Sequence, residues 1–388
     1  IFYEGPPSAN GQPGIHHVMA RTIKDAFCRY KTLKGYNVKR KAGWDTHGLP
    51  VELGVEKELG ISKDDIGDKI SISEYNNACK EAVMKYTSEW ESLTNKMGYW
   101  IDLSDPYVTY KPKYMETVWW LIKSISEKGL LYKGYTVQPY SPAAGSGLSS
   151  HELNQPGAYK QISDTSVIAQ FKCVEDDTSA KFNSLYPFYF LAWTTTPWTL
   201  PSNTALTVGA KIEYSFIKTF NQYTKEKTTV VVASSLIEKV FAKNFFVVKH
   251  EDELETFQES DSKIPYCVIT SCKGIDIENL KYERVWDESP LPIDNPENAF
   301  RVILGDFVTT EDGTGIVHTA PTFGADDYKA AKSATPEVPP LQVLDSNGNK
   351  IPLVDLKGKF IDGIGMISGK YVKNEYYEEE DVPEKSVD

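Results

Sequence analysis

The sequence predicts an α/β protein in two parts, a parallel α/β first half and a second domain that is mainly β and barrel-like. Residues 1–33 read as strand, loop and helix, and two further helical stretches follow. Beyond residue 160, short β-branched or aromatic runs alternate with turn residues. A length of 388 residues with 40% hydrophobic content suits two or three domains with real cores.

The overall composition excludes several classes of protein. A net charge of −12 argues against a surface coated with basic residues for non-specific nucleic-acid binding. No apolar run approaches the ~20 residues that cross a bilayer, so we expect no membrane partner. The five cysteines are scattered without a CxxC pair, which suits a reducing compartment such as the cytoplasm and gives a metal site little support. Because Ile1 falls within an expected strand, we expect a fragment of a longer protein.

The opening segment predicts a site for a phosphate group. Residues 1–3 read as a strand and residues 5–14 as a loop dense in Gly, Pro and Asn. His16 and His17 then open a helix, where backbone N–H groups and the helix dipole favour an anion. The alternative is a solvated or capping histidine. The helix is predicted from apolar residues at steps of three and four, namely Met19, Ile23, Ala26, Tyr30 and Leu33.

A second polar loop, residues 43–50, follows the next expected strand. In a parallel α/β sheet such loops meet at the carboxyl ends of the strands, which makes Asp45 and His47 candidate ligand contacts. The alternatives are an Asx turn for Asp45 and a packed, hydrogen-bonded ring for His47. Amphipathic periodicity then predicts one long helix over residues 73–97 and another around 115–122, with Gly129 as its cap.

Over residues 135–157 the local composition becomes rich in Gly, Ser, Pro and Asn, which indicates a domain boundary. A helix is expected at 325–334, and the acidic tail reads as a surface linker. Nine strands are predicted in the second domain: 166–173, 188–195, 204–208, 214–220, 228–234, 245–250, 266–270, 301–308 and 315–319.

Two loops of the second domain carry candidate chemistry. Residues 193–203 place hydroxyls between two tryptophans, and residues 312–321 end a glycine-bearing turn near a histidine. Asp326 and Asp327 follow at the start of the expected helix. Hydroxyls, one imidazole and one carboxylate could bind a ribose and an ammonium group and orient a water. The alternatives are strand-end threonines and an N-capping aspartate.

Four strings of residues together resemble one family. Residues 3–11 and 43–52 look like the first catalytic half of the class I aminoacyl-tRNA synthetases, in particular their isoleucyl branch. Residues 193–201 and 313–327 look like the editing insertion of that branch. The resemblance implies a Rossmann-like catalytic half at 1–138, a linker at 139–160, an inserted editing domain at 161–375 and an acidic tail or linker at 376–388.

The resemblance implies ATP-dependent ligation of isoleucine to its tRNA through an aminoacyl-adenylate. ATP, with Mg²⁺, would contact Asn10, Gly14 and His17, and catalytic roles would fall to His17 and His16. No covalent nucleophile is needed, because positioning and electrostatics do the chemistry. The partners implied are tRNA(Ile), isoleucine and ATP, acting on a monomer.

The resemblance also implies the amino-acid contacts and the editing site. Pro6 would line the isoleucine side-chain pocket and Asp45 would accept its amino group. In the editing domain, Asp327 would take the ammonium group of a misacylated valyl-tRNA while a water hydrolyses the ester. The terminal adenosine would be held by hydroxyls, an amide and an imidazole, those of Thr194, Thr195, Thr196, Asn203 and His318.

The sequence departs from the family pattern at three places. One is that the lysine-rich signature of the second catalytic half does not occur in the 388 residues, so we do not expect this chain alone to activate an amino acid, although editing could remain. The usual His-x-Gly-His signature reads Gly14-Ile15-His16-His17, with glycine and the outer histidine exchanged. Residues 141–145 contain no cysteine where many relatives carry a zinc-binding pair, so we expect no zinc there. Two alternative functions stay open, a non-catalytic tRNA-binding paralogue and a deacylase that only edits.

Overall fold

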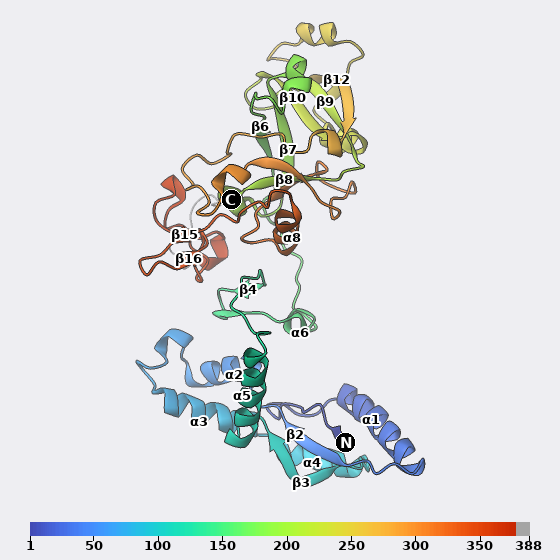
Figure 1. Ribbon diagram of the computed structural model, residues 1–388, viewed down its shortest axis with the longest axis vertical. Coiled ribbons are helices and arrows are strands. Elements are labelled where there is room, and N and C mark those ends of the chain that lie inside the picture. Colours follow the sequence, from blue (N-terminus) through green and yellow to red (C-terminus); the bar gives the residue numbers. More distant parts are fainter. Residues whose placement is uncertain (378–388) are drawn as a thin grey trace. The chain divides into compact units, whose positions relative to one another are not determined.

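The computed structural model describes residues 1–377 and divides into two compact units (Figure 1). Unit 1 is Ile1–Gly134, and unit 2 begins at Tyr135. No helix in residues 1–377 is both long enough and apolar enough to cross a membrane. Each unit carries its own sheets, and each contains one of the two groups of candidate site residues.

Unit 1 contains a parallel sheet, as the sequence predicts, but the third of its three strands is not predicted. The strands β1 (Phe2–Tyr3), β2 (Arg40–Trp44) and β3 (Asp102–Val108) lie in the order β1-β2-β3. The loops after β1 and β2 are joined by the backbone N–H of Asp45, which donates to the Pro7 carbonyl at 3.0 Å. Five helices accompany the sheet: α1 (Ile15–Leu33), α2 (Leu49–Leu59), α3 (Ile72–Val83), α4 (Thr87–Lys96) and α5 (Pro112–Glu127).

The prediction of a single helix over residues 73–97 is wrong, because the helical conformation is interrupted between α3 and α4. The N–H of Tyr86 donates to the carbonyl of Ala9 at 2.9 Å instead of to a carbonyl one turn earlier in the helix. A hydrogen bond to the opening loop therefore replaces a hydrogen bond within the helix. The apolar periodicity of residues 73–97 does not indicate this long-range contact. The helix predicted around 115–122 is confirmed as α5, and Gly129 follows its cap residue Lys128.

The face of α1 that the periodicity marks as apolar is exposed within the described residues. Met19, Ile23, Tyr30 and Leu33 are all more than half exposed, whereas the buried side chains of α1 are Arg21 and Cys28. The helix itself is confirmed. The face it turns inward is the one that carries Arg21, because that guanidinium has partners on α4.

Gly43 allows an aromatic ring to cross the small sheet. Tyr107 pairs with Gly43 across β2 and β3, and its hydroxyl donates to the carbonyl of Glu4 at 2.5 Å. A Cβ at position 43 would lie 2.3 Å from the ring. The ring therefore spans β2 over the one residue without a side chain and fixes the start of the opening loop.

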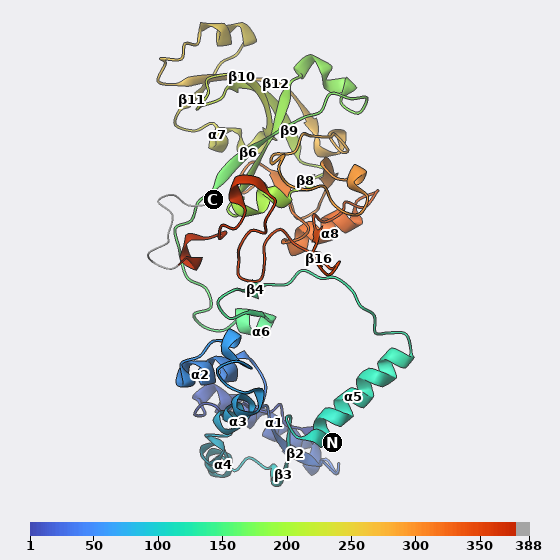
Figure 2. The ribbon, with the colours of Figure 1, turned by 90° about the vertical axis from the view of Figure 1, so that its left-hand side faces the viewer.

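Unit 2 is mainly β and contains all nine predicted strands. Six of them form a sheet in the order β11-β12-β9-β10-β7-β6, whose central members lie side by side in Figure 2. The other three form a sheet in the order β13-β8-β14. The strands are β6 (Val167–Lys172), β7 (Phe188–Thr194), β8 (Ala205–Val208), β9 (Glu213–Phe220), β10 (Lys227–Ala233), β11 (Phe245–Val247), β12 (Ile264–Lys273), β13 (Arg301–Leu304) and β14 (Ile316–Thr319).

Neither of these sheets closes on itself within the described residues, since β11 and β6 are the two ends of the six-stranded order. The two sheets share one aromatic and aliphatic core that includes Phe171, Phe190, Leu206 and Phe216. They are also joined by the N–H of Ala233, which donates to the Thr314 carbonyl at 2.9 Å. This bond holds the turn before β14 against the end of β10.

The remaining elements of unit 2 are short. The helix predicted at 325–334 is confirmed as α8 (Ala325–Ser333). Most of the acidic tail predicted at 376–388 lies outside the described residues, as do its charges. The other elements are β4 (Tyr140–Ser141), β5 (Ser146–Gly147), α6 (Ser150–Leu153), α7 (Ile237–Val240), β15 (Val343–Leu344) and β16 (Lys350–Ile351).

We predict that Gly43→Ala lowers the free energy of unfolding by about 1–3 kcal/mol, because the added methyl group overlaps the Tyr107 ring. Denaturant unfolding measures this. The matched control is Gly54→Ala within α2, where a Cβ meets nothing within 4 Å and stability should rise by up to ~1 kcal/mol. Equal changes in the two variants would contradict the crossing ring as a constraint.

Candidate functional site

Unit 1 has a cavity of about 400 Å³ between the opening loop and α1. Among the predicted site residues, Pro6, Asn10 and His17 line it. Asp45 lies outside the lining, but its backbone bond to Pro7 places it beside the same loop. The structure thus brings the loop after β1, the start of α1 and the loop after β2 to one edge of the sheet.

His17 is held in one orientation by the chain around it. Its Nδ1 accepts the backbone N–H of Gly14 at 2.9 Å, so Nε2 is the nitrogen that carries the hydrogen. The ring meets the edge of Trp90, with centroids 4.7 Å apart. Burial lowers the pKa of His17, and the nearby His16 and Arg21 lower it further. The ring is a neutral hydrogen-bond donor beside the cavity.

His16 and Gly14 lie next to His17 but outside the cavity lining. The His16 ring is exposed, and its centroid lies 3.8 Å from that of His17. A Cβ on Gly14 would lie 2.8 Å from the His16 ring. A side chain at position 14 would therefore require the exposed His16 ring to turn away from its present position.

Three residues of this cavity escape the sequence prediction. Arg21 and Lys24 follow His17 at steps of four and three along α1, a spacing that places them on the same helical face. Arg21 donates to Thr94 at 2.8 Å and lies over the Trp90 ring, while Lys24 pairs with the buried Glu4 at 2.7 Å. Trp90 donates through Nε1 to the Gly11 carbonyl at 2.9 Å. In the sequence, Trp90 belongs to an aromatic stripe along a predicted helix, and such a stripe is typical of a hydrophobic core.

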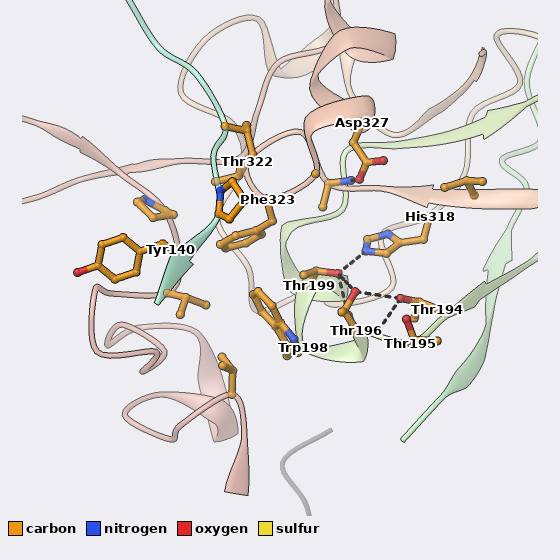
Figure 3. Close-up of a pocket in the computed structure, with 18 of the residues that line it drawn as sticks. Tyr140, Thr194, Thr195, Thr196, Trp198, Thr199, His318, Thr322, Phe323 and Asp327 are labelled. Atoms are coloured by element: carbon orange, nitrogen blue, oxygen red, sulfur yellow. Dashed lines mark hydrogen bonds between the residues drawn. The ribbon is translucent and has the colours of Figure 1, made fainter. Parts of the chain in front are cut away.

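Unit 2 has a larger cavity of about 770 Å³, shown in Figure 3. Five of the six residues predicted for the second site line it: Thr194, Thr195, Thr196, His318 and Asp327. The threonines come from the end of β7 and the turn after it, His318 from β14 and Asp327 from α8. Segments more than 100 residues apart in the chain thus meet around one hollow.

His318 is buried and bonded through both ring nitrogens. Nε2 lies 3.0 Å from the hydroxyl of Thr199, and Nδ1 lies 2.8 Å from the amide nitrogen of Asn203. Burial lowers the pKa of His318 from its usual 6.5 to about 4. The ring is therefore neutral near pH 7. It joins β14 to the loop that contains the threonines.

Asp327 offers a partly buried carboxylate. Burial raises its pKa, whereas the backbone N–H of Ala320, which donates to Oδ2 at 2.9 Å, lowers it. One carboxylate oxygen is thus held by the protein. A carboxylate in such surroundings suits a cationic ligand group, since water screens the attraction poorly there.

Asn203 is the predicted residue that does not line the cavity within the described chain. It lies behind His318 and its amide is fully engaged by neighbouring groups. The sequence prediction also missed an aromatic wall of the cavity, formed by Tyr140, Trp198 and Phe323 (Figure 3). Trp198 and Phe323 meet edge to face with centroids 5.0 Å apart.

The described residues contain no group of three or more His, Cys, Asp or Glu side chains arranged to hold a metal ion. Ser141 ends β4, and residues 142–145 form the turn from β4 to its paired strand β5. The backbone N–H of Ala144 donates to the Ser141 hydroxyl at 3.2 Å. A hydroxyl closes this turn without a thiolate.

We predict that Trp90→Phe lowers the free energy of unfolding by about 1–3 kcal/mol, because the Gly11 carbonyl loses its donor and Arg21 loses part of its ring contact. Denaturant titration of unit 1 fluorescence measures the change. Trp119→Phe on the exposed side of α5 serves as the control and should stay within ~0.5 kcal/mol of the parent. Similar losses in both variants would refute a structural role specific to Trp90.

We predict that burial of neutral His318 makes unit 2 less stable in acid. Below pH 6.5 the ring gains a proton in the unfolded chain, but in the folded chain only near pH 4. The unfolded state therefore binds more protons between these values, and the free energy of unfolding rises with pH across the window. The full contribution, about 3 kcal/mol, is present above pH 6.5.

Urea unfolding between pH 5 and 7 tests this prediction. His318→Gln should flatten the slope of stability against pH, whereas His151→Gln, at an exposed position, should keep it. An unchanged slope in His318→Gln would show that the ring does not cause the effect.

Comparison with known proteins places the chain in a family. The family model for "tRNA synthetases class I (I, L, M and V)" matches residues 1–308. An isoleucine–tRNA ligase of Bacteroides fragilis is 56% identical over 97% of this chain, and one of Cytophaga hutchinsonii is 56% identical over 98%. "Isoleucine--tRNA ligase 2" of Bacillus cereus is 41% identical over 96%.

The chain spans about a third of the length of these relatives, 33%, 33% and 31% respectively. Among solved structures, a crystal structure titled "GlLeuRS-CP1" matches 43% of this chain and 59% of that chain, at 16% identity and a TM-score of 0.30, a similarity too remote to bear on the fold. The match to the family model covers well over half of the chain. It includes the site residues of unit 1 and the threonines of the unit 2 site, whereas His318 and Asp327 lie beyond residue 308. The chain belongs to the class I tRNA synthetases of the isoleucine, leucine, methionine and valine group.

Proposed function

We propose that this chain is part of an enzyme that ligates isoleucine to tRNA(Ile) through an aminoacyl-adenylate and hydrolyses misacylated valyl-tRNA(Ile). Relatives named isoleucine–tRNA ligase, at 56% identity over nearly the whole chain, support the choice of isoleucine. The observation that carries the hydrolytic part is the cavity of unit 2. It gathers three threonine hydroxyls, a buried imidazole and a carboxylate from three separate segments.

The cavity of unit 1 supports the activation step. The isoleucine carboxylate would attack the α-phosphate of ATP in line, so the protein has to position reactants and stabilise charge. His17 offers an N–H beside the cavity, and Arg21 adds a positive charge, whereas the charge of Lys24 is paired with that of Glu4. Asn10 and Gly14 would contact the nucleotide, with His16 beside them, while Mg²⁺ would arrive on the phosphates and need few protein ligands.

The amino-acid end of this site would lie at the joined loops. Pro6 lines the cavity, and Asp45 follows β2 beside Pro7, where its carboxylate would accept the isoleucine ammonium group. A pocket that holds isoleucine also admits valine, because one methylene is worth only about 1–3 kcal/mol. Isoleucine against valine is the established example of this limit and not a result of this structure. A second site that hydrolyses the valyl product is therefore needed.

The cavity of unit 2 suits this second, hydrolytic site. Asp327 would accept the valyl ammonium group, because its carboxylate keeps one oxygen free of the Ala320 bond. Thr194, Thr195 and Thr196 present hydroxyls that suit the ribose of the terminal adenosine. His318 and Asn203 would shape this wall, and a bound water would cleave the ester.

The finer features of the proposal follow the same family. Unit 1 would be the first half of a Rossmann-like catalytic domain, at about 1–138, and residues 139–160 a linker. Residues 161–375 would be an inserted, mainly β editing domain, with 376–388 as a tail or linker. We further propose a cytoplasmic monomer without zinc at residues 141–145; metal analysis that finds stoichiometric zinc there would count against it.

We predict that Asp327→Asn lowers kcat/KM for hydrolysis of valyl-tRNA(Ile) about 10- to 100-fold, because a charge-assisted bond to the ammonium group becomes neutral. The amide oxygen can still accept the Ala320 N–H, so the fold should survive. Asp326→Asn is the matched control, since the neighbouring carboxylate is exposed and pairs with Lys329. Single-turnover deacylation measures both.

The same assay separates the alternatives. Valyl-tRNA hydrolysis by this chain, together with isoleucine-dependent pyrophosphate exchange by a longer form, supports the proposal. Hydrolysis without exchange in either form supports an editing-only deacylase. Binding of tRNA without hydrolysis or exchange supports a non-catalytic paralogue, and equal activity of the Asp327 and Asp326 variants removes Asp327 from the site.

A further inference from the structure

A line of four buried polar side chains begins at the floor of the unit 2 cavity and continues into the core behind it. It consists of Tyr282, Asn203, His318 and Thr199, each less than a tenth exposed. Tyr282 lies in the segment after β12, and neither it nor Asn203 lines the cavity in the described chain. Since buried polar groups need partners, the direction of each hydrogen bond in this line can be worked out.

One end of the line is fixed by a backbone carbonyl. The Asn203 amide nitrogen donates to the carbonyl of Ala205 at 2.8 Å, and a carbonyl can only accept. The same nitrogen lies 2.8 Å from Nδ1 of His318 and 3.4 Å from the carbonyl of Thr319, so its second hydrogen favours the nearer Nδ1. An amide nitrogen has no lone pair with which to accept a hydrogen bond. Nδ1 must therefore present its lone pair, and the ring hydrogen belongs on Nε2.

The other end of the line is fixed in the same way. The Thr199 hydroxyl donates to the carbonyl of Thr196 at 2.8 Å. Its oxygen, 3.0 Å from Nε2, is left to accept the hydrogen of His318. Two acceptor-only carbonyls at opposite ends thus require the same tautomer of the ring.

Tyr282 completes the line. Its hydroxyl donates to the free oxygen of the Asn203 amide at 2.6 Å, which holds the amide in the orientation that the Ala205 carbonyl demands. The Tyr282 ring meets Phe171 edge to face at 5.3 Å, and Phe171 stacks near His318 at 6.5 Å. The polar line is thereby enclosed in aromatic core.

We propose that Tyr282 and Asn203 are positioning residues of the hydrolytic site, which hold His318 as the Nε2–H tautomer and so fix the Thr199 hydroxyl at the cavity floor. The inference rests on the proposed function for its link to hydrolysis. It has a chemical consequence. Both nitrogens of His318 are used within the protein, so the ring cannot take a proton from the attacking water. Thr199 has no hydrogen left for a ligand, so a ligand would take its hydrogen bonds from the hydroxyls of Thr194, Thr195 and Thr196, which line the same cavity.

Nitrogen spectra of the 388-residue chain labelled with ¹⁵N-histidine test the tautomer directly. Among its six histidines, His318 is identified by the signals lost in His318→Gln. At pH 7 we expect His318 to show an unprotonated Nδ1 and a protonated Nε2. A protonated Nδ1 in the parent chain would overturn the proposal.

Asn203→Asp supplies the sharpest perturbation. A carboxylate oxygen then faces Nδ1 in place of the amide hydrogen, so Nδ1 should become protonated in the spectrum. An Nδ1 that stays unprotonated in folded Asn203→Asp would overturn the proposal. If that variant fails to fold, Tyr282→Phe decides the matter, because it removes one hydroxyl and leaves the ring.

We predict that Tyr282→Phe lowers kcat for valyl-tRNA(Ile) hydrolysis roughly three- to tenfold with little change in KM, and broadens or shifts the His318 signals. Tyr266→Phe, a buried tyrosine outside this line, is the matched control and should change neither. Unchanged spectra and kcat in Tyr282→Phe would remove Tyr282 from the proposal. Absence of hydrolysis in the parent chain would instead refute the proposed function, while the spectra still decide the tautomer.

Discussion

The unit 2 cavity depends on the two hydrogen bonds of one buried imidazole. His318 lies on β14, and its ring bonds Thr199 on one side and Asn203 on the other. Burial of an imidazole without partners would cost several kcal/mol, and these bonds offset that cost only while the loop after β7 stays beside β14. The pairing of β14 with β8 sets the ring's position, and the ring in turn sets the position of the threonine hydroxyls.

Unit 1 uses a related arrangement with a different outcome. In both units Nδ1 of a histidine accepts an N–H of the chain, from the backbone of Gly14 or from the amide of Asn203. His17 keeps its Nε2 hydrogen beside a cavity, whereas His318 spends its hydrogen on Thr199. With its tautomer fixed, His17 can donate its Nε2 hydrogen directly to a ligand. His318, with its tautomer fixed, instead holds the neighbouring hydroxyl of Thr199 in place. Burial lowers the pKa of both rings, which favours their neutral forms near pH 7.

The sequence was informative wherever local patterns decide structure. Strand runs between turn residues located all nine strands of the two larger sheets of unit 2. Helical periodicity located α1 and α5, and α8 was also predicted, whereas α2 was not. It failed where a distant contact decides. The break between α3 and α4 follows from the bond between Tyr86 and Ala9, and the buried face of α1 follows from the partners of Arg21 on α4. Neither partner is near in sequence.

The site residues show the same division. Motifs led to the threonines, His318 and Asp327, which the structure places around one cavity, but they gave Asn203 the same status although it lies a layer behind. Trp90 and Tyr282 belong to no recognisable motif. In a sequence, an aromatic residue that only fills the core cannot be distinguished from one that also orients a neighbouring group. Their importance depends on one polar atom each, the indole nitrogen and the phenol oxygen, whose partners only the fold reveals.

The central claim is that the unit 2 cavity binds the valyl end of a misacylated tRNA while His318 stays bonded to the protein. A crystal structure of this chain with valine joined to adenosine by a hydrolysis-resistant amide tests it most directly. The account predicts the valyl ammonium group on Asp327, the ribose beside Thr194 and Thr196, and His318 still bonded to Thr199 and Asn203. A ligand bound elsewhere, or a His318 ring turned from Thr199 onto the ligand, would contradict it.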